Sequence, residues 1–146
     1  RVFKPICGET TPFLGMATLA SDMAECDRQA LINEYDNAIL YTDYYLDKLM
    51  KRVEDRNAIV MYSSDHGQSL GEEGIFLHGN MDRKEQRHIP MFMWMSDAFI
   101  AKNKGKLEIV EGKKDNELMH SALFHSLLDC SGIEGEVVNK SLSLCN

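Results

Sequence analysis

The sequence predicts an α/β fold in which helices flank a sheet, because of the order of four predicted elements. Side chains of a helical stripe recur from residue 27 to 55. Two short apolar runs follow, at 58–64 and 90–96, and each has the length and composition of a buried strand. A second helical pattern covers 117–131. The order helix, strand, strand, helix is typical of part of an α/β layer fold.

Composition places the chain among globular proteins and argues against two function classes. It has 146 residues, the usual size of one domain, and its 44% hydrophobic residues can supply a core. A formal net charge of −7 argues against nucleic-acid binding. The longest apolar run, Ile89–Met95, is far shorter than a membrane-spanning helix. Because the chain starts with Arg1 and lacks a signal peptide, we expect it to be part of a longer protein.

The N-terminal 25 residues look irregular, with prolines and glycines as punctuation. Cys7 and Cys26 flank an 18-residue segment within this region. A disulfide that pinned such a loop would contribute about 3 kcal/mol. Composition leaves equally open that the four cysteines are buried free thiols of a cytosolic protein. None of them forms a CxxC pair, so a cysteine zinc site is not expected.

A long helix is expected from Asp27 to Asp55. Asp27 is a suitable N-cap, since its carboxylate can accept a backbone N–H of the first turn. The predicted inward stripe consists of Leu31, Tyr35, Ala38, Ile39, Thr42, Leu46, Leu49, Met50 and Val53. Three tyrosines, at 41, 44 and 45, broaden this stripe, and we interpret them as core and interface packing rather than as catalytic groups.

The remaining elements are predicted from turn residues and caps. Residues 67–87 contain four glycines and are expected to form one long loop, which is usually functional inside a compact domain. Pro90 stands at the first position of the second strand, where proline is tolerated. Residues 101–114 are expected to form a solvated turn or hairpin whose five lysines promote solubility.

The last helix is expected to be capped by Asp115 and ended by Gly132. Its predicted inward-facing residues are Leu118, Ala122, His125 and Leu128. A short edge strand is expected near 136–138.

The main candidate site is the pair Asp65 and His66, at the end of the first predicted strand. Ligands collect at the carboxyl ends of strands in open α/β sheets, and carboxylate oxygen and imidazole nitrogen are both good zinc ligands. Gly67 would allow a sharp turn after the pair. His78 is the next candidate ligand. A bare Asp-His pair is also frequent by chance, so a polar strand end and a turn-capping His78 remain an alternative.

Other polar residues are weaker candidates. Glu72 and Glu73 are interpreted as solvated loop acids. The histidines expected to be structural are His88, His120 and His125. Neither Ser63, Ser64 nor Ser69 lies in a G-x-S-x-G nucleophile elbow, so the sequence offers no clear nucleophile.

The segment Ser64–Gly79, S-D-H-G-Q-S-L-G-E-E-G-I-F-L-H-G, resembles a motif of the phosphoethanolamine transferases, which belong to the alkaline phosphatase/sulfatase superfamily. Further likenesses are F-K-P-I-C at Phe3–Cys7, the N-E-Y-D-N and Y-T-D of the first helix, and Q-R-H-I-P-M-F-M-W-M-S at Gln86–Ser96. Gln68 replaces the commonest glutamate, and the usual proline after L-H-G is missing at Asn80. Gln68 is interpreted as a tolerated change. The missing proline and a Cys7–Cys26 loop that is longer than typical leave the acceptor substrate open.

The resemblance implies a partial alkaline-phosphatase-like or sulfatase-like layer fold, with residues 1–146 as the C-terminal portion of a periplasmic catalytic domain. It implies zinc as the metal, Asp65 and His66 as two of its ligands, and His78 as a catalytic residue in the same pocket. The nucleophilic threonine and a glutamate ligand would lie upstream of this chain. The resemblance also favours a Cys7–Cys26 bridge and suggests a second one between Cys130 and Cys145.

By the same resemblance, the intact protein would be anchored in the bacterial inner membrane by helices of its own polypeptide. It would move phosphoethanolamine from phosphatidylethanolamine to a lipopolysaccharide or other lipid or glycan acceptor. A fragment without the nucleophile would be inactive alone. Two alternatives remain: a sulfatase or phosphodiesterase of the same superfamily, and a non-catalytic domain.

Overall fold

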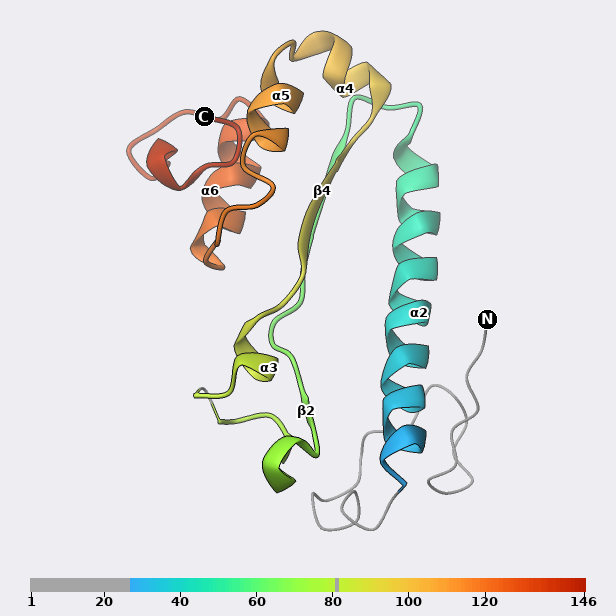
Figure 1. The fold of residues 1–146 in the computed structure, drawn as a ribbon. Coiled ribbons are helices and arrows are strands. Elements are labelled where there is room, and N and C mark those ends of the chain that lie inside the picture. Colours follow the sequence, from blue (N-terminus) through green and yellow to red (C-terminus); the bar gives the residue numbers. More distant parts are fainter. Residues whose placement is uncertain (1–26, 81) are drawn as a thin grey trace. The chain divides into compact units, whose positions relative to one another are not determined.

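The computed structural model describes residues 27–80 and 82–146 (Figure 1). The chain divides into two compact units. The first unit contains the described residues of Arg1–Leu49 and Ser64–Ile89, and the second contains Met50–Ser63 and Pro90–Asn146. Cys7 and Cys26 lie outside the described residues, so the bridge between them stays a prediction. Within the described ranges, no helix has both the length and the apolar character needed to cross a bilayer.

The predicted first helix is present as α2, Arg28–Val53. Asp27 caps it as predicted, because its Oδ2 accepts the backbone N–H of Ala30 at 3.3 Å. The buried residues of this helix are Ala30, Leu31 and Asn37. The three tyrosines, 41, 44 and 45, are at least half exposed. Their predicted place in a core is therefore wrong for the described part of the chain, and an interface role stays a prediction.

Residues 67–87 are more ordered than the single loop we predicted. β2 (Ser69–Leu70) pairs antiparallel with β3 (Phe76–Leu77), and the 3-10 turn η1 (Glu72–Gly74) joins the two strands. The one-turn helix α3 (Lys84–Arg87) follows. These elements are two to four residues long, too short for a periodic pattern to reveal them. Gly71, at φ +97°, provides the left-handed backbone that begins the turn.

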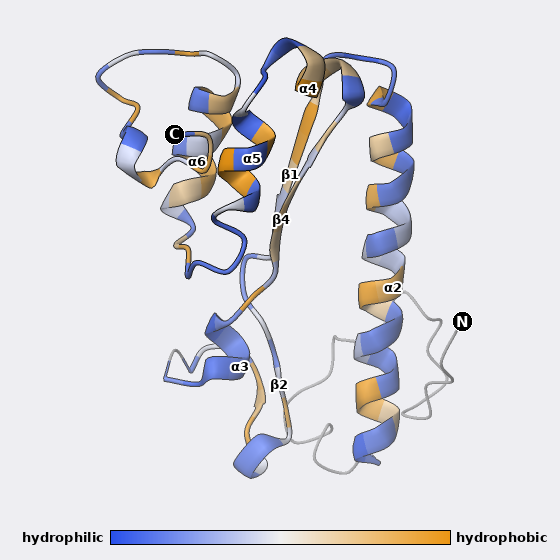
Figure 2. Cartoon of the chain, turned by 45° about the horizontal axis from the view of Figure 1, so that its top comes forward, coloured by the Kyte–Doolittle hydropathy of each residue, from blue (hydrophilic) through white to orange (hydrophobic). Residues whose placement is uncertain are grey.

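Both predicted strands are confirmed in the second unit. β1 (Ile59–Ser63) pairs antiparallel with β4 (Met91–Met95), with Ile59 opposite Met95 and Ser63 opposite Met91. Every residue of the two strands is half-buried rather than fully buried. Tyr62 and Phe92 stack across the pair, with ring centroids 5.4 Å apart. Figure 2 shows the apolar character of β4, in contrast to the hydrophilic α3.

The lysine-rich segment forms helices and not the predicted turn or hairpin. α4 (Asp97–Lys102) begins at Ser96, whose Oγ accepts the N–H of Phe99, and α5 (Lys106–Glu111) follows. The Lys106 ammonium donates to the carbonyls of Asp129 and Cys130 at 3.1 and 2.9 Å. Lys113 similarly donates to carbonyls of the C-terminal segment. These two lysines are structural, so our solubility interpretation is wrong for them.

The last helix, α6 (Ser121–Cys130), starts four residues later than predicted, so Asp115 does not cap it. Ala122 is buried as predicted, but Leu118 lies before the helix and is 39% exposed. Gly132 ends the helix as predicted, with φ +77°, a conformation that favours glycine. Residues 136–138 form a turn rather than an edge strand, and the 3-10 turn η2 (Lys140–Leu142) follows.

A disulfide joins Cys130 to Cys145, with the two Cα atoms 5.4 Å apart. The second bridge that the resemblance suggested is thus present. Together with Phe99, the two half-cystines form the buried cluster of the second unit. The half-buried side chains that pack around it are Ile59, Met93, Met95 and Val110. This cluster connects the β1–β4 pair to the helices that follow it.

Candidate active site

Asp65 and His66 follow β1 in the chain after one intervening residue, Ser64, and their position depends on Gly67. The Gly67 N–H donates to the backbone oxygen of Gln86 at 2.9 Å. A Cβ atom at position 67 would lie 2.0 Å from the backbone oxygen of Glu85. Glycine is therefore required at position 67 because the backbone passes close to α3. We had predicted a different reason, a sharp turn.

The imidazole of His66 is held in one tautomer. Its Nδ1 lies 2.9 Å from the carbonyl oxygen of Gly67. Because a carbonyl oxygen can only accept, Nδ1 carries a hydrogen, and in the neutral imidazole Nε2 is then the nitrogen with the free lone pair. The Ser64 hydroxyl donates to the backbone oxygen of His66 at 2.8 Å, which fixes the chain at this residue.

Asp65 directs its carboxylate toward the same point as His66. Asp65 Oδ2 lies 3.6 Å from His66 Nε2, and Asp65 Oδ1 accepts the backbone N–H of His66 at 3.0 Å. This N–H, followed by the backbone N–H of Asp65 itself and the nearby imidazoles, lowers the pKa of the Asp65 carboxyl below its ordinary value of 3.8. The side chain is 87% exposed, so it offers an accessible carboxylate at neutral pH.

His78 joins this pair from the other end of the 67–78 segment. Its ring centroid lies 4.1 Å from that of His66, with 31° between the ring planes. Its Nδ1 is 3.2 Å from Gln68 Oε1. Leu77, immediately before it, has φ +65°, a left-handed backbone that is strained for a branched side chain. The fold thus brings all three predicted site residues together in the first unit.

The separation of the Asp65 and His66 donor atoms suits two ligands of one cation. Two ligands at zinc bond lengths in a tetrahedral site lie roughly 3.3 Å apart. The 3.6 Å between Oδ2 and Nε2 is close to this value, and the open Nε2 lone pair is the form that binds metal. Within residues 27–80 and 82–146, no set of three or more His, Cys, Asp or Glu side chains is arranged around one point for a metal ion.

The nearby acids of η1 have structural roles. Glu72 accepts the Leu70 N–H at 2.6 Å and pairs with Arg28 at 3.1 Å. Burial raises the pKa of Glu72, but the backbone and Arg28 hydrogen bonds outweigh it, so the net shift is downward. Glu73 pairs with Arg83 at 2.7 Å, which lowers its pKa. Glu73 is exposed as predicted for a loop acid, but Glu72 is held by these contacts and is not merely solvated.

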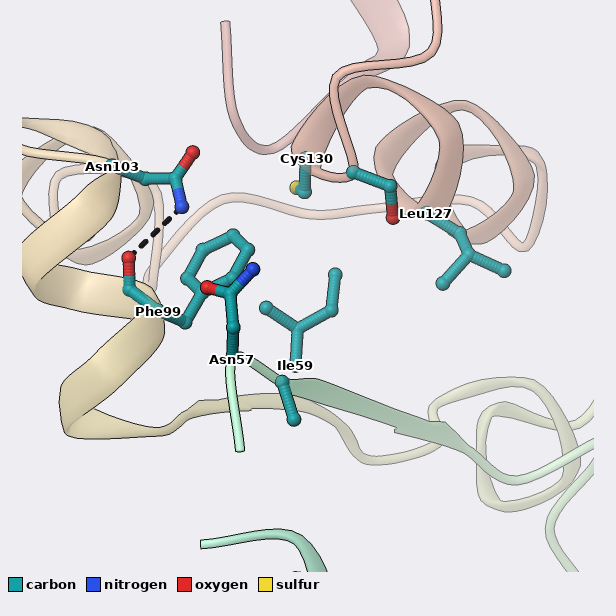
Figure 3. A pocket seen from close by; sticks show the side chains of 8 residues that line it. Asn57, Ile59, Phe99, Asn103, Leu127 and Cys130 are labelled. Atoms are coloured by element: carbon teal, nitrogen blue, oxygen red, sulfur yellow. Dashed lines mark hydrogen bonds between the residues drawn. The ribbon is translucent and has the colours of Figure 1, made fainter. Parts of the chain in front are cut away.

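His125 also has a structural contact, because its Nδ1 accepts the Asn139 N–H at 3.2 Å. The second unit contains a pocket of about 380 Å³ (Figure 3). Its lining residues are Asn57, Ala58, Ile59, Phe99, Asn103, Leu127, Cys130 and Ser131. None of these carries a titratable side chain, since Cys130 is in the disulfide. The pocket lining therefore contains no side chain of the usual general acids or bases.

Gln86 is the residue near the site that our sequence reasoning did not single out for a role. Its side chain is 2% exposed and hydrogen-bonds to Ser69 and to the backbone of Asn80. The only sequence signal was its place at the start of the Gln86–Ser96 likeness. The Ser69 hydroxyl accepts the Gln86 amide, and the Ser64 hydroxyl donates to the backbone oxygen of His66.

Comparison with known proteins supports the family resemblance. The chain is 37% identical over 133 residues to the phosphoethanolamine transferase EptA of Helicobacter pylori, covering 88% of this chain and 22% of that protein. It is 34% identical over 143 residues to the phosphatidylethanolamine transferase Mcr-1 of Escherichia coli, covering 93% and 23% respectively. The chain thus spans less than a quarter of the length of these curated relatives.

A solved structure gives the same picture for the fold. The soluble domain of lipooligosaccharide phosphoethanolamine transferase A from Neisseria meningitidis matches with a TM-score of 0.78 and 34% identity. The match covers 84% of this chain and 39% of that one, which confirms the predicted α/β, sulfatase-like fold. The sulfatase family model matches residues 1–133. The chain therefore belongs to the sulfatase family.

Proposed function

We propose that residues 1–146 form the C-terminal portion of the periplasmic catalytic domain of a phosphoethanolamine transferase. The whole protein would move phosphoethanolamine from phosphatidylethanolamine to a lipopolysaccharide or other lipid or glycan acceptor. The observation that carries this proposal is the convergence of Asp65, His66 and His78 within a sulfatase-family fold. Relatives named as transferases of phosphatidylethanolamine and of lipid A phosphoethanolamine support the donor and the class of acceptor.

Members of the sulfatase superfamily are generally metalloenzymes, and we assign zinc to this site, with Asp65 and His66 as two of its ligands. The donor separation, the accessible carboxylate and the fixed tautomer of His66 support the assignment. When bound, zinc would act as a Lewis acid that activates a hydroxyl nucleophile and offsets charge on the phosphoryl group. The nucleophile is a threonine that we assign to residues outside this chain.

The protein residues have separate tasks in this proposal. Asp65 supplies negative charge and His66 a neutral nitrogen donor. His78, 4.1 Å from the His66 ring, lies where it can orient a substrate oxygen or exchange a proton with it. The Gln68 contact at Nδ1 orients its ring.

We also propose that the protein is held at the periplasmic face of the inner membrane by helices of its own polypeptide. The Cys130–Cys145 disulfide supports an oxidising compartment. Acceptors of the lipid A class, which occur in the names of relatives, support a membrane location.

The intact protein, purified together with the residues to which we assign the nucleophile, can be tested with fluorescent phosphatidylethanolamine, by measuring diacylglycerol release and label transfer to lipid A. The proposal predicts both products and no turnover of an aryl sulfate. Turnover of the aryl sulfate without transfer would favour a sulfatase, and diacylglycerol release without acceptor labelling would favour a phosphodiesterase.

Asp65→Ala is expected to abolish both zinc retention and transfer. Asp82→Ala is the matched control, because Asp82 is an exposed acid of the same unit. Retained zinc and retained activity in the Asp65 variant would refute the ligand assignment.

A further inference from the structure

We propose that Gln86 is a positioning residue that holds the segments carrying His66 and His78 against each other. The functional meaning of this arrangement rests on the proposed transferase site, but the arrangement itself can be tested without it. Gln86 lies in α3, and its side chain is almost fully buried at 2% exposure. A buried amide is stable only when its polar atoms are hydrogen-bonded, so its partners show which parts of the chain it connects.

Gln86 makes hydrogen bonds in three directions. Its side-chain Nε2 donates to Ser69 Oγ at 2.7 Å. Its Oε1 accepts the backbone N–H of Asn80 at 2.8 Å. Its backbone oxygen accepts the N–H of Gly67 at 2.9 Å. All three partners belong to the 67–80 segment, so one residue fixes this segment at its first, third and last positions.

The three bonded positions are close in sequence to the two histidines. Gly67 immediately follows His66, and Asn80 follows His78 by two residues. Because both residues are fixed to Gln86, the backbones that carry the two imidazoles have a common reference point. A shift of α3 would therefore move both rings, which now lie 4.1 Å apart.

Ser69 extends this connection to the residue before His78. Ser69 is fully buried and lies directly opposite Leu77 in the β2–β3 pair. Leu77 has the strained φ of +65°, and such strain persists only when surrounding contacts fix the conformation. The Gln86–Ser69 hydrogen bond provides such a contact on the opposite strand.

The alternative is that Gln86 only stabilises the first unit and has no specific effect on the rings. Two variants separate these possibilities. Gln86→Met keeps a similar side-chain volume but removes both side-chain hydrogen bonds. In Gln86→Glu, burial favours the neutral acid, whose hydroxyl can donate to Ser69 Oγ while its carbonyl accepts the Asn80 N–H, so it is the conservative rescue. Ser126→Ala is the matched control, because Ser126 is fully buried in the second unit and accepts the Leu144 N–H at 2.9 Å.

The experiment uses the purified protein with ¹⁵N-labelled histidine. NMR measures the nuclear Overhauser contact between the His66 and His78 rings, and calorimetric titration of the metal-free protein with zinc alone measures affinity. In Gln86→Met we expect the ring contact to disappear and zinc affinity to fall about tenfold, the effect typical of losing an outer-shell contact. Gln86→Glu should restore the ring contact, and Ser126→Ala should leave both readings as in the unmodified protein.

An unchanged ring contact and zinc affinity in Gln86→Met would overturn the proposal. So would equal losses in Ser126→Ala, since the effect would then be general destabilisation. If Gln86→Met does not fold, hydrogen exchange of the backbone amides in the unmodified protein tests the positioning role of Gln86 instead. The Asn80 amide must be strongly protected, and exchange at the rate of an unstructured peptide would overturn the positioning role. If the unmodified protein keeps the ring contact but shows no transfer activity, the result would count against the proposed function alone.

Discussion

Both units of the chain bury polar side chains, but the buried cluster of the second unit differs in kind from the buried residues around the candidate site of the first. The buried cluster of the second unit is apolar and cross-linked, formed by Phe99 and the Cys130–Cys145 disulfide. In the first unit, the segment that carries the candidate site is held around two buried polar residues, Ser69 and Gln86. Two non-glycine residues with positive φ, Glu73 and Leu77, also occur in this segment.

The two kinds of burial have different consequences: one mainly raises the free energy of unfolding, and the other fixes the positions of individual atoms. Apolar burial is strong but non-directional, so it stabilises the second unit without fixing individual atoms to fractions of an ångström. Hydrogen bonds contribute less net free energy but depend strongly on direction, and a buried group that loses its partner costs free energy. A site with two imidazoles 4.1 Å apart therefore benefits from the polar surroundings of the first unit.

The largest effect is expected from the disulfide of the second unit. The double variant Cys130→Ala and Cys145→Ala should lower the free energy of unfolding by about 3 kcal/mol, the entropic value for a loop of this length. Denaturant unfolding followed at Trp94, in β4, measures the change. The His66–His78 ring contact should stay intact in the folded variant. Loss of that contact would contradict the division of roles between the units.

A smaller but more local effect is expected from Gly67→Ala. The added Cβ would lie 2.0 Å from the backbone oxygen of Glu85, so the backbone must shift. Overpacking of this kind costs about 2 kcal/mol. Hydrogen exchange should show faster opening at Gln86 and unchanged exchange at Phe99 in the second unit. Equal acceleration at both amides would show that the two units open together.

The smallest effect concerns the pH dependence of the first unit. The folded state lowers the pKa of Glu72 below its ordinary value of 4.5, so the ionised Glu72 stabilises the fold above pH 4.5. This stabilisation is lost as the pH falls from 4.5 through the folded pKa. Glu72→Gln should lower the hydrogen-exchange protection of the Leu70 amide at neutral pH. It should also make that protection depend less on pH as the solution is acidified.

Exposed Glu117 provides the control for this variant, as Glu117→Gln. We attribute the pH dependence of the Leu70 amide to the Glu72 carboxylate. An equal loss of protection on acidification in the unmodified protein and in Glu72→Gln would contradict this.

The sequence predicted the elements that carry a long local signal. The apolar runs of β1 and β4, the Asp27 cap of α2 and the Gly132 end of α6 were all identified. These features depend on residues close in the chain, so periodicity and turn chemistry reveal them. The three site residues were proposed from their place at a strand end and from the family resemblance.

The errors arose where distant contacts override local composition. Lys106 suggested a solvated turn, but its ammonium binds carbonyls more than 20 residues away, at the end of α6. The role of Gln86 depends on Ser69, 17 residues earlier. The exposed tyrosines of α2 follow a helical period that predicts burial, while periodicity shows only that the residues share one face.

The central claim is that Asp65 and His66 bind the same cation. Its most direct test is a crystal structure of the zinc-loaded protein with anomalous diffraction data collected at the zinc absorption edge. We expect a single anomalous peak within bonding distance of both Asp65 Oδ2 and His66 Nε2, about 2.0–2.2 Å from each. A peak bound elsewhere, with these two side chains pointing apart, would contradict it.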